Sequence, residues 1–328
     1  FKINVQHQYS VLLILSCKKN VFEHNNFIDI PNNFPLPVIP ESNQLNQSRI
    51  NLGKMLFYDP ILSIDSSISC NSCHKQEFAF SDNKSISPGV KSRFGSRNTM
   101  SLANVVYYDA FQREGGVKSL EMQVLVPIEE HNEMGFNIIL ASERMLLHDK
   151  YVELSQIAYN RNPDPYVITR SIASFERTLI SGNSDFDKNN LTLDQKNGKN
   201  LFFSNKLKCS ECHSGFLFTN QNFENNGLYE IYNDFGRYNL TNQVKDIGKF
   251  KVPSLRNIEL TEPYMHDGSI LTLEDVITHY SKGGNYHINK SEHIKGFKIS
   301  HKEKEDLIKF LESLTDYEFV SNNEFKNF

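Results

Sequence analysis

The residues of this sequence that could carry chemistry are two cysteine pairs, each followed directly by a histidine: C-N-S-C-H at 70–74 and C-S-E-C-H at 209–213. Covalent haem attachment needs two thiols that reach the two vinyl groups of one haem, and a histidine beside the second thiol that can bind the iron. Each motif supplies all three groups. The sequence therefore predicts two c-type haems, attached through Cys70, Cys73, Cys209 and Cys212 and bound at the iron by His74 and His213.

Two other uses of paired cysteines explain these motifs less well. A structural zinc site would have to bring both pairs together from distant parts of the chain, and it would leave the adjacent histidines without a role. A redox-active cysteine pair needs no histidine at the next position, yet one is present in both motifs. Haem attachment is the interpretation that uses every chemical group of the two motifs.

A repeated stretch precedes both motifs and indicates which elements hold them. The sequences G-K-M-L-F at 53–57 and G-K-N-L-F at 198–202 lie in segments with apolar residues at helical spacing, one short loop before each haem motif. Further helices are expected over 166–180, from Thr272 to Tyr280, and after Ser300, where Glu303 completes a capping box. Because a helix and a haem motif recur together, we expect one haem in each of two domains.

The composition fits two globular domains of ordinary size. The 328 residues are enough for two cores, and 39% of them are hydrophobic. The formal net charge is -4, with acidic and basic residues interspersed and no long basic run, which argues against nucleic acid as a partner. No segment shows the sustained alternation of a strand. We therefore expect an all-α fold of two c-type cytochrome domains connected by long loops.

Composition also predicts the domain boundaries. The N-terminal domain is expected at 43–186 and the C-terminal domain at 187–316, because a polar stretch rich in Gly, Asn and Asp separates them. Residues 18–42 are polar and proline-rich, which is typical of a tether or an extended entry segment. Residues 317–328 are expected to form a tail.

Residues 1–17 look like a secretory leader. A short apolar run ends in L-S-C at 15–17 and is followed by lysines, as in bacterial lipoprotein signals, so Cys17 is a candidate lipidation site. A buried free cysteine is the alternative. The leader predicts export to the periplasm or cell envelope, with contact to the membrane through a lipid anchor.

Several further motifs resemble those of the bacterial di-haem cytochrome c peroxidases and their MauG-type relatives. They occur in the family's order around both haem motifs, from about residue 43 to residue 316. The matching stretches are F-S-D at 80–82, G-S-R-N at 95–98, Gln123 to E-M-G at 133–135, F-E-R-T at 175–178, V-P-S-L-R-N at 252–257 and P-Y-M-H-D-G at 263–268. The resemblance implies that two cytochrome domains pack with their haems facing a shared interface.

The resemblance also implies roles for residues near the first haem. Glu133 matches the distal acid-base residue and Gln123 matches its hydrogen-bonding companion. A carboxylate there can move a proton from the inner to the outer peroxide oxygen, so that water leaves as the O–O bond breaks. Where many family members place a blocking histidine, this chain has Val90, so the first iron is expected to be open. His131 and His148 are the other histidines that could bind it.

For the second haem, Tyr280 matches the iron ligand of the MauG-type enzymes, whereas the ordinary peroxidases place a methionine there. A phenolate is a harder, anionic donor than a thioether, so it should favour ferric iron. Met265 and His279 are alternative ligands, and Tyr280 could also be a core aromatic residue beside an iron with another ligand.

Two further features of the family concern the region between the haems. Asn98, Thr261 and Pro263 match a calcium site, in which an asparagine and two backbone carbonyls offer hard oxygen ligands. Arg113 stands where the family usually has a tryptophan between the haems, and the sequence contains no tryptophan. An aromatic electron relay would therefore need a tyrosine such as Tyr107 or Tyr264.

The function that the resemblance implies is reduction of hydrogen peroxide, with electrons from a small cytochrome or copper protein entering through the second haem. The alternative is a MauG-like oxidase that modifies a partner protein, which Val90 and Tyr280 favour. A pure electron carrier is the third hypothesis, but it would have no use for Gln123 and Glu133. The oligomeric state stays open, with a homodimer among the options.

Overall fold

The computed structural model describes residues 27–327, so the predicted leader and Cys17 lie outside the described residues. The described chain is helical with long loops, as expected, and short 3-10 turns connect many of its elements. The α-helices are α1 (Gln47–Tyr58), α2 (Cys70–Cys73), α3 (Leu120–Glu129), α4 (Ile138–Leu146), α5 (Asp149–Tyr159), α6 (Pro165–Glu176), α7 (Leu193–Phe202), α8 (Tyr238–Thr241), α9 (Leu273–Ser281), α10 (His301–Glu312) and α11 (Tyr317–Ser321).

Side-chain caps define where several of these helices begin. The predicted capping box is present at α10, where the side chains of Ser300 and Glu303 each accept a backbone N–H. The Thr272 side chain caps α9 as expected. Helix α6 begins after Asp164, which accepts from the Val167 N–H, and it ends at Glu176, four residues earlier than the predicted 166–180 helix.

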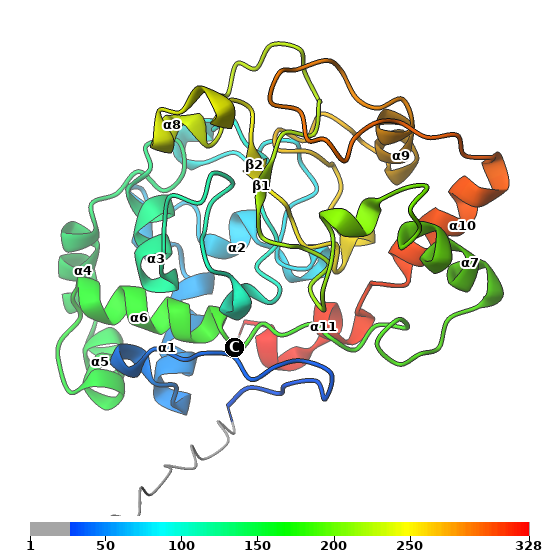
Figure 1. Ribbon diagram of the computed structural model, residues 1–328. Coiled ribbons are helices and arrows are strands. Elements are labelled where there is room, and N and C mark those ends of the chain that lie inside the picture. The colour runs from blue at the N-terminus through cyan, green and yellow to red at the C-terminus, as the bar shows by residue number, and fades with distance from the viewer. Residues whose placement is uncertain (1–26, 328) are drawn as a thin grey trace, which may run out of the picture.

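The predicted repeat is built as two crossed helix pairs, α1 with α6 and α7 with α10, which lie on opposite sides of the molecule (Figure 1). Each crossing depends on the glycine of the repeated stretch. A Cβ at Gly53 would overlap the backbone carbonyl of Ser171, and one at Gly198 would overlap that of Asp306. Glycine therefore allows the backbones of each pair to approach closely.

Three phenylalanines pack in the same way in both halves. In the first half, the Phe57 ring meets Phe175 at 5.2 Å and Phe80 at 6.0 Å between ring centroids. In the second half, the corresponding rings of Phe202, Phe310 and Phe218 meet at 5.3 Å and 5.9 Å. Such aromatic pairs contribute about 0.5–1.5 kcal/mol each beyond the area they bury. The repeat in the sequence thus corresponds to a repeat in packing.

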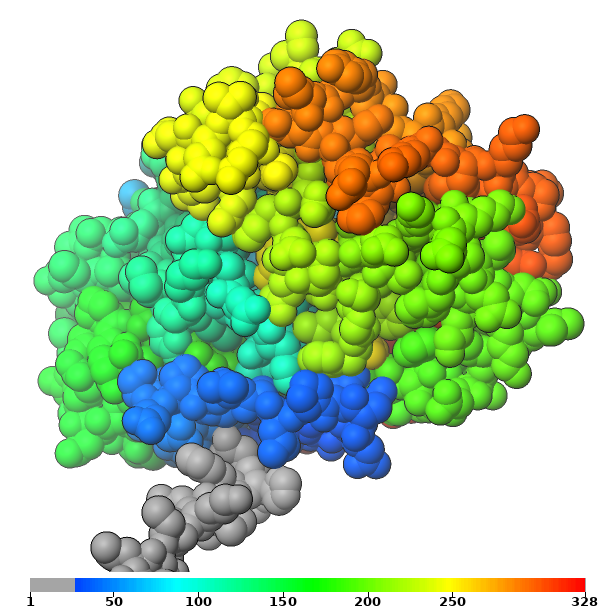
Figure 2. All heavy atoms as spheres, in the orientation of Figure 1, coloured from blue at the N-terminus to red at the C-terminus, as the bar shows by residue number. Residues whose placement is uncertain are grey.

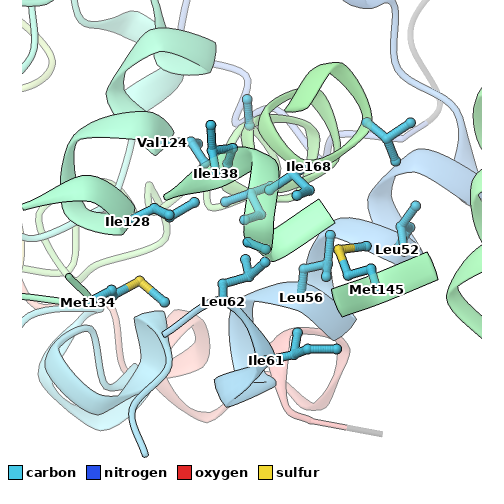
Figure 3. Packing of buried hydrophobic residues seen from close by; sticks show 14 of the residues in the cluster. Leu52, Leu56, Ile61, Leu62, Val124, Ile128, Met134, Ile138, Met145 and Ile168 are labelled. Atoms are coloured by element: carbon cyan, nitrogen blue, oxygen red, sulfur yellow. The ribbon is translucent and has the colours of Figure 1, made fainter. Parts of the chain in front are cut away.

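The larger apolar cluster of the first half joins α1, α3, α4, α5 and α6. Figure 3 shows Leu56 of α1, Val124 and Ile128 of α3, Ile138 of α4 and Ile168 of α6 pointing toward one another. A corresponding cluster in the second half joins α7, α9 and α10 through Phe202, Ile277, Leu307 and Phe310, among others. Each haem motif is followed by loops rather than by strands. Within residues 27–327 a single small sheet pairs β1 (Phe223–Glu224) with β2 (Phe250–Lys251) antiparallel.

Both ends of the described chain pack across the molecule. Residues 27–46 run beneath both halves (Figure 2), and Phe34 packs edge-on against Tyr107 and Phe216. At the other end, α11 brings Phe319 against Phe80 in the first half, and Gln76 donates to the Phe319 carbonyl at 3.2 Å. The described part of the expected tether and the expected tail are therefore structural parts of the fold.

The polar stretch predicted as a junction is also held in place. Asp187 accepts two hydrogen bonds from the Arg256 guanidinium, at 2.8 and 2.9 Å, and both side chains are buried. The Asp316 carboxylate accepts the backbone N–H groups of Gly182 and Asn183 at 3.0 and 2.9 Å. Removing one partner of such a buried pair costs about 3–5 kcal/mol.

None of the helices within residues 27–327 has the length and apolar character needed to cross a membrane.

Candidate haem sites and distal residues

The first motif forms helix α2 and its cap. The side chains of Ser69 and Ser72 make a capping box at the start of this helix, which holds Cys70 and Cys73 one turn apart. His74 follows as the capping residue, and its Nδ1 lies 2.9 Å from the Phe80 carbonyl oxygen. A carbonyl partner assigns the ring proton to Nδ1 and leaves Nε2 as the metal-binding nitrogen.

The second motif holds its histidine in the same way. Residues Cys209–Glu211 form a 3-10 turn, and the Nδ1 of His213 lies 3.1 Å from the Phe218 carbonyl and 3.2 Å from the Pro253 carbonyl. Phe80 and Phe218 share a left-handed backbone conformation, with φ of 58° and 53°. This uncommon conformation for a large residue occurs at the same place in both halves, where the phenylalanine carbonyl meets the histidine ring.

The thiols have the properties of attachment groups rather than of redox catalysts. Burial raises the pKa of all four motif cysteines, to about 11 for Cys73 and Cys212. A redox-active pair needs a lowered thiol pKa. Within residues 27–327 no group of three or more Cys, His, Asp or Glu side chains could hold a metal ion, so the zinc interpretation has no support.

A large cavity opens beside the second motif and has a volume of about 470 Å³. Cys209, Cys212 and His213 line it, and many of its other lining side chains are apolar, among them Leu273, Ile277, Phe297, Leu307 and Leu311. The apolar side chains on α9 and α10 at helical spacing thus line the same cavity as the motif. This cavity has the lining expected for a flat, largely apolar group attached at the two cysteines.

Tyr280 and Met265 lie on the same cavity as His213. The Tyr280 side chain interacts electrostatically with the thiols of Cys209 and Cys212, and burial raises its pKa to about 12. His279 does not line the cavity, and its Nε2 lies 3.0 Å from the Asn226 carbonyl. Of the three expected ligands of the second iron, Tyr280 and Met265 are therefore placed at the cavity and His279 is not.

Glu133 lies near the first motif, in the loop after α3. This loop turns back on the helix, because the N–H of Glu133 donates to the Glu130 carbonyl and that of Met134 donates to the Pro127 carbonyl. The Glu133 carboxylate interacts electrostatically with both Cys70 and Cys73. Although the residue as a whole is exposed, surrounding protein atoms and then the carboxylate of Glu130 raise its pKa to about 7. A carboxyl group with this pKa can both bind and release a proton at neutral pH.

Four buried side-chain atoms of this half lack a hydrogen-bond partner among the described residues, and two of them are amide or carboxyl oxygens. The Oε1 of Gln123, on α3, and the Oε2 of Glu176, at the end of α6, are both buried without a hydrogen bond. Burial raises the pKa of Glu176 to about 8, and its carboxylate interacts electrostatically with Cys70. Buried polar atoms are rarely left unpaired, so both point to an additional group bound in this half.

Glu176 belongs to the F-E-R-T stretch at 175–178, and the sequence predicted no separate role for it. No signal in the sequence distinguishes it, because Glu176 precedes Arg177, which could have neutralised it. In the structure the Arg177 guanidinium pairs with Glu121 at 2.7 Å. The arginine in the motif is thus neutralised by another carboxylate. Only the packing of α3 against α6 reveals that Glu176 is the unpaired one.

Comparison with known proteins gives the same family as the motifs. Residues 47–197 match the family model described as di-haem cytochrome c peroxidase. The methylamine utilization protein MauG of Methylorubrum extorquens is 36% identical over 286 residues, covering 84% of this chain and 80% of the relative. The cytochrome c551 peroxidase of Nitrosomonas europaea is 35% identical over 256 residues, covering 75% of this chain and 76% of the relative.

This chain belongs to the di-haem cytochrome c peroxidase family. A crystal structure of a MauG-like protein associated with microbial copper homeostasis superposes with a TM-score of 0.87 at 31% identity, covering 91% of this chain and 98% of that chain. Membership implies two c-type haems. The two motifs, their carbonyl-bound histidines, the cavity at Tyr280 and the unpaired carboxyl oxygen of Glu176 near Cys70 all fit that cofactor.

The loop that carries the blocking histidine in many family members is packed here around Val90. This side chain is buried, and its backbone N–H donates to the Glu133 carbonyl at 2.8 Å. A valine offers no ligand atom. His131 is exposed and contacts Arg93, while His148 is exposed beside Tyr151, so both alternative histidines have contacts at the surface.

The three residues expected at a calcium site, Asn98, Thr261 and Pro263, all line the cavity beside the second motif. Arg113 lies with them, and its guanidinium donates to both oxygens of Asn98. Of the two tyrosines named for an electron relay, Tyr264 lines this cavity, whereas the Tyr107 hydroxyl donates to the Pro35 carbonyl at 2.9 Å. The oxygens of Asn98 thus have a cationic partner within the chain.

Proposed function

We propose that this protein is a peroxidase that reduces hydrogen peroxide to water with electrons from a small redox protein. Curated relatives at similar identity include cytochrome c peroxidases. The observation that carries the proposal is Glu133, a carboxyl group near the first haem motif whose pKa lies at about 7. A protein that only carried electrons would have no use for a proton-transfer group at that position.

In this proposal the first half reduces peroxide and the second half receives electrons. Haem, when bound, supplies the redox chemistry, and Cys70, Cys73 and His74 would hold it in the first half. Glu133 would accept the proton from the inner peroxide oxygen and deliver it to the outer one, so that the leaving group departs as water. Gln123 would donate a hydrogen bond to peroxide from α3, with its Oε1 free to accept one in return.

In the second half, Cys209, Cys212 and His213 would hold the other haem, with Tyr280 as the proposed second ligand of its iron. A phenolate would favour the ferric state. Electrons from a small cytochrome or copper protein would enter through this half. We also propose the division into domains at 43–186 and 187–316, since each range contains one helix crossing and one motif.

The test is steady-state oxidation of a reduced small cytochrome by hydrogen peroxide, with catalytic amounts of the fully haem-loaded protein and no prior reduction. Rapid turnover is the expected result, because Val90 cannot block the first iron. If turnover appears only after prior reduction, the first site is closed at rest and the role given to Val90 is wrong. If none appears under either condition, the peroxidase proposal fails.

A MauG-like oxidase that modifies a partner protein is the second candidate. Tyr280 at the second cavity and Val90 at the first site favour it, as does the similarity to a methylamine utilization protein. Its signature would be a long-lived change in the haem spectrum after peroxide alone, without turnover of the small cytochrome. A carrier with two closed irons would bind neither cyanide nor azide at rest, so ligand binding separates it from both enzymes.

The proposed location is the periplasm or cell envelope, because residues 1–17 resemble an export leader. Lipid attachment at Cys17 is part of this proposal. Mass spectrometry of the mature N-terminus from a native-like host tests it: a diacylglyceryl group on Cys17 supports the anchor, and an unmodified thiol excludes it. A homodimer stays a proposal to be tested by light scattering of the haem-loaded protein.

A further inference from the structure

We propose that the guanidinium of Arg113 takes the place of the calcium ion that the family resemblance implies between the two halves. The Nη2 of Arg113 donates to the backbone and side-chain oxygens of Asn98, both at 2.9 Å, and its Nε donates to the same backbone oxygen at 3.1 Å. The Oδ1 is the hard oxygen atom that Asn98 would offer to an ion. The chain therefore provides its own cation.

The orientation of the Asn98 amide supports this assignment. The Nδ2 of Asn98 donates to the Lys84 carbonyl at 3.1 Å, and its backbone N–H donates to the His266 carbonyl at 2.8 Å. Because carbonyl oxygens can only accept, they fix which end of the amide is nitrogen. The Oδ1 must then face Arg113, and Asn98 is satisfied without a metal.

Arg113 itself is held firmly in this position. It lines the same cavity as Thr261 and Pro263, the other two residues of the expected site. Its backbone carbonyl accepts the N–H of Lys251, on β2, at 2.6 Å. Backbone and side chain are thus both anchored, and moving the guanidinium aside for an ion would break hydrogen bonds to Asn98 and leave a buried charge unpaired.

A calcium ion at Asn98 would lie beside the guanidinium of Arg113, and the two positive charges would repel each other. The carboxylates that act on Arg113 are those of Asp267, Asp234 and Glu114. Asp234 and Glu114 pair with Arg97, and Asp267 accepts a hydrogen bond from the Tyr229 hydroxyl at 2.6 Å. Each of these carboxylates therefore already has a partner within the chain.

One residue then explains two departures from the family pattern. By the resemblance, Arg113 stands at the position of the tryptophan between the haems. A tryptophan carries no cation and offers only one donor, so a chain with tryptophan there would leave the Asn98 oxygens to an ion. An arginine removes the aromatic group and supplies the cation at the same time. The inference concerns ion content and holds whether or not the protein is a peroxidase.

The test measures calcium content and thermal stability of the haem-loaded protein, with and without a calcium chelator. For the unaltered protein we expect no stoichiometric calcium and no change in Tm on chelation or on adding calcium. Retention of stoichiometric calcium, with a fall in Tm on chelation, would overturn the proposal.

The variant Arg113→Ala tests the replacement directly. We expect its Tm to fall by several degrees and calcium to recover part of that loss, because the Oδ1 of Asn98 is freed for an ion in the cavity that Thr261 and Pro263 also line. The matched control is Arg237→Ala, which removes a guanidinium that donates to the Glu114 carbonyl at 2.8 Å but does not contact Asn98. Its Tm should not respond to calcium.

If Arg113→Ala does not fold, Arg113→Gln supplies the same test with a neutral side chain that keeps an amide donor. A variant at position 113 that folds but shows no response to calcium would mean that the guanidinium does not stand in an ion's place, and the proposal would be wrong.

Discussion

The two halves of this protein share a frame and differ in what they place near the haem. In both, a glycine lets two helices cross closely, three phenylalanines pack at the crossing, and a phenylalanine carbonyl holds the motif histidine. The first half then adds Gln123 and Glu133, whereas the second adds Tyr280 and Met265. In the proposed function, the frame holds a haem in each half, and the added residues serve proton transfer in the first half and iron ligation in the second.

This comparison separates residues whose substitution should affect both halves alike from residues whose substitution should affect one half only. The frame depends on close approach of two helix backbones and on burial in both halves. Equivalent substitutions in the two halves should therefore lower the free energy of unfolding by similar amounts. The added residues depend on position relative to one iron, so their loss should affect one half only. Four measurements test this distinction.

The largest effect is expected from Glu133→Gln, which keeps the shape of the side chain but cannot accept a proton. The rate of peroxide reduction should fall by about 10²–10⁴-fold, the usual contribution of general acid-base catalysis. The unaltered protein should gain activity as the pH rises through about 7, where Glu133 becomes a carboxylate, and the variant should lack this rise. Steady-state kinetics across pH check both, and the exposed neighbour Glu129→Gln should behave like the unaltered protein.

The frame is tested by Gly53→Ala and Gly198→Ala. Each added Cβ would overlap a carbonyl of the partner helix, so each variant should lose about 1–3 kcal/mol of stability, the usual cost of overpacking. Chemical denaturation of the haem-loaded protein measures the loss. Gly95→Ala is the control, because nothing lies within 4 Å of its added Cβ. A large loss at one crossing and none at the other would show that the halves are not equivalent.

A pH-dependent effect on stability is expected from Glu176→Gln. Burial raises the pKa of Glu176 from 4.5 to about 8 in the folded protein. Between these values the folded state keeps a proton that the unfolded state loses, so stability falls as pH rises, with a slope of up to about 1.4 kcal/mol per pH unit.

The neutral Glu176→Gln variant should therefore gain stability relative to the unaltered protein as pH rises from 4.5 to 8, measured by denaturation at several pH values. Glu303→Gln serves as the control, because the pKa of Glu303 is lowered to about 2 and its stabilising effect is lost only as pH falls toward that value. The difference for this control should stay constant across the same window. A constant difference for Glu176→Gln as well would contradict the raised pKa.

The smallest effect on stability is expected from Tyr280→Phe, which removes only a hydroxyl. If Tyr280 binds the second iron, the reduction potential of that haem should rise, because an anionic donor that favours ferric iron is lost. Spectroelectrochemistry measures the two potentials separately, and the first haem should be unchanged. The exposed Tyr286→Phe is the control. Unchanged potentials in Tyr280→Phe would leave Met265 as the candidate ligand.

Several features of this protein could be predicted from the sequence because they depend on local spacing. The C-x-x-C-H motifs, the Gly-Lys-x-Leu-Phe repeat, and the caps at Thr272 and Ser300 involve residues a few positions apart, where geometry follows from the helix itself. The resemblance of the longer motifs identified the family, and the comparisons confirmed it.

Other features depend on residues that meet only after folding. Residues 317–327 lack any motif, yet Phe319 and Phe325 pack on Phe80 because the first half offers them an apolar surface. Likewise, Glu176 is unpaired because Arg177 turns to Glu121, and Asn98 accepts hydrogen bonds from Arg113, which is distant from it in sequence. Sequence determined which chemical groups are present and how neighbours along a helix are spaced. Tertiary structure decided which charges and oxygens become partners, because burial and long-range contacts set their energies.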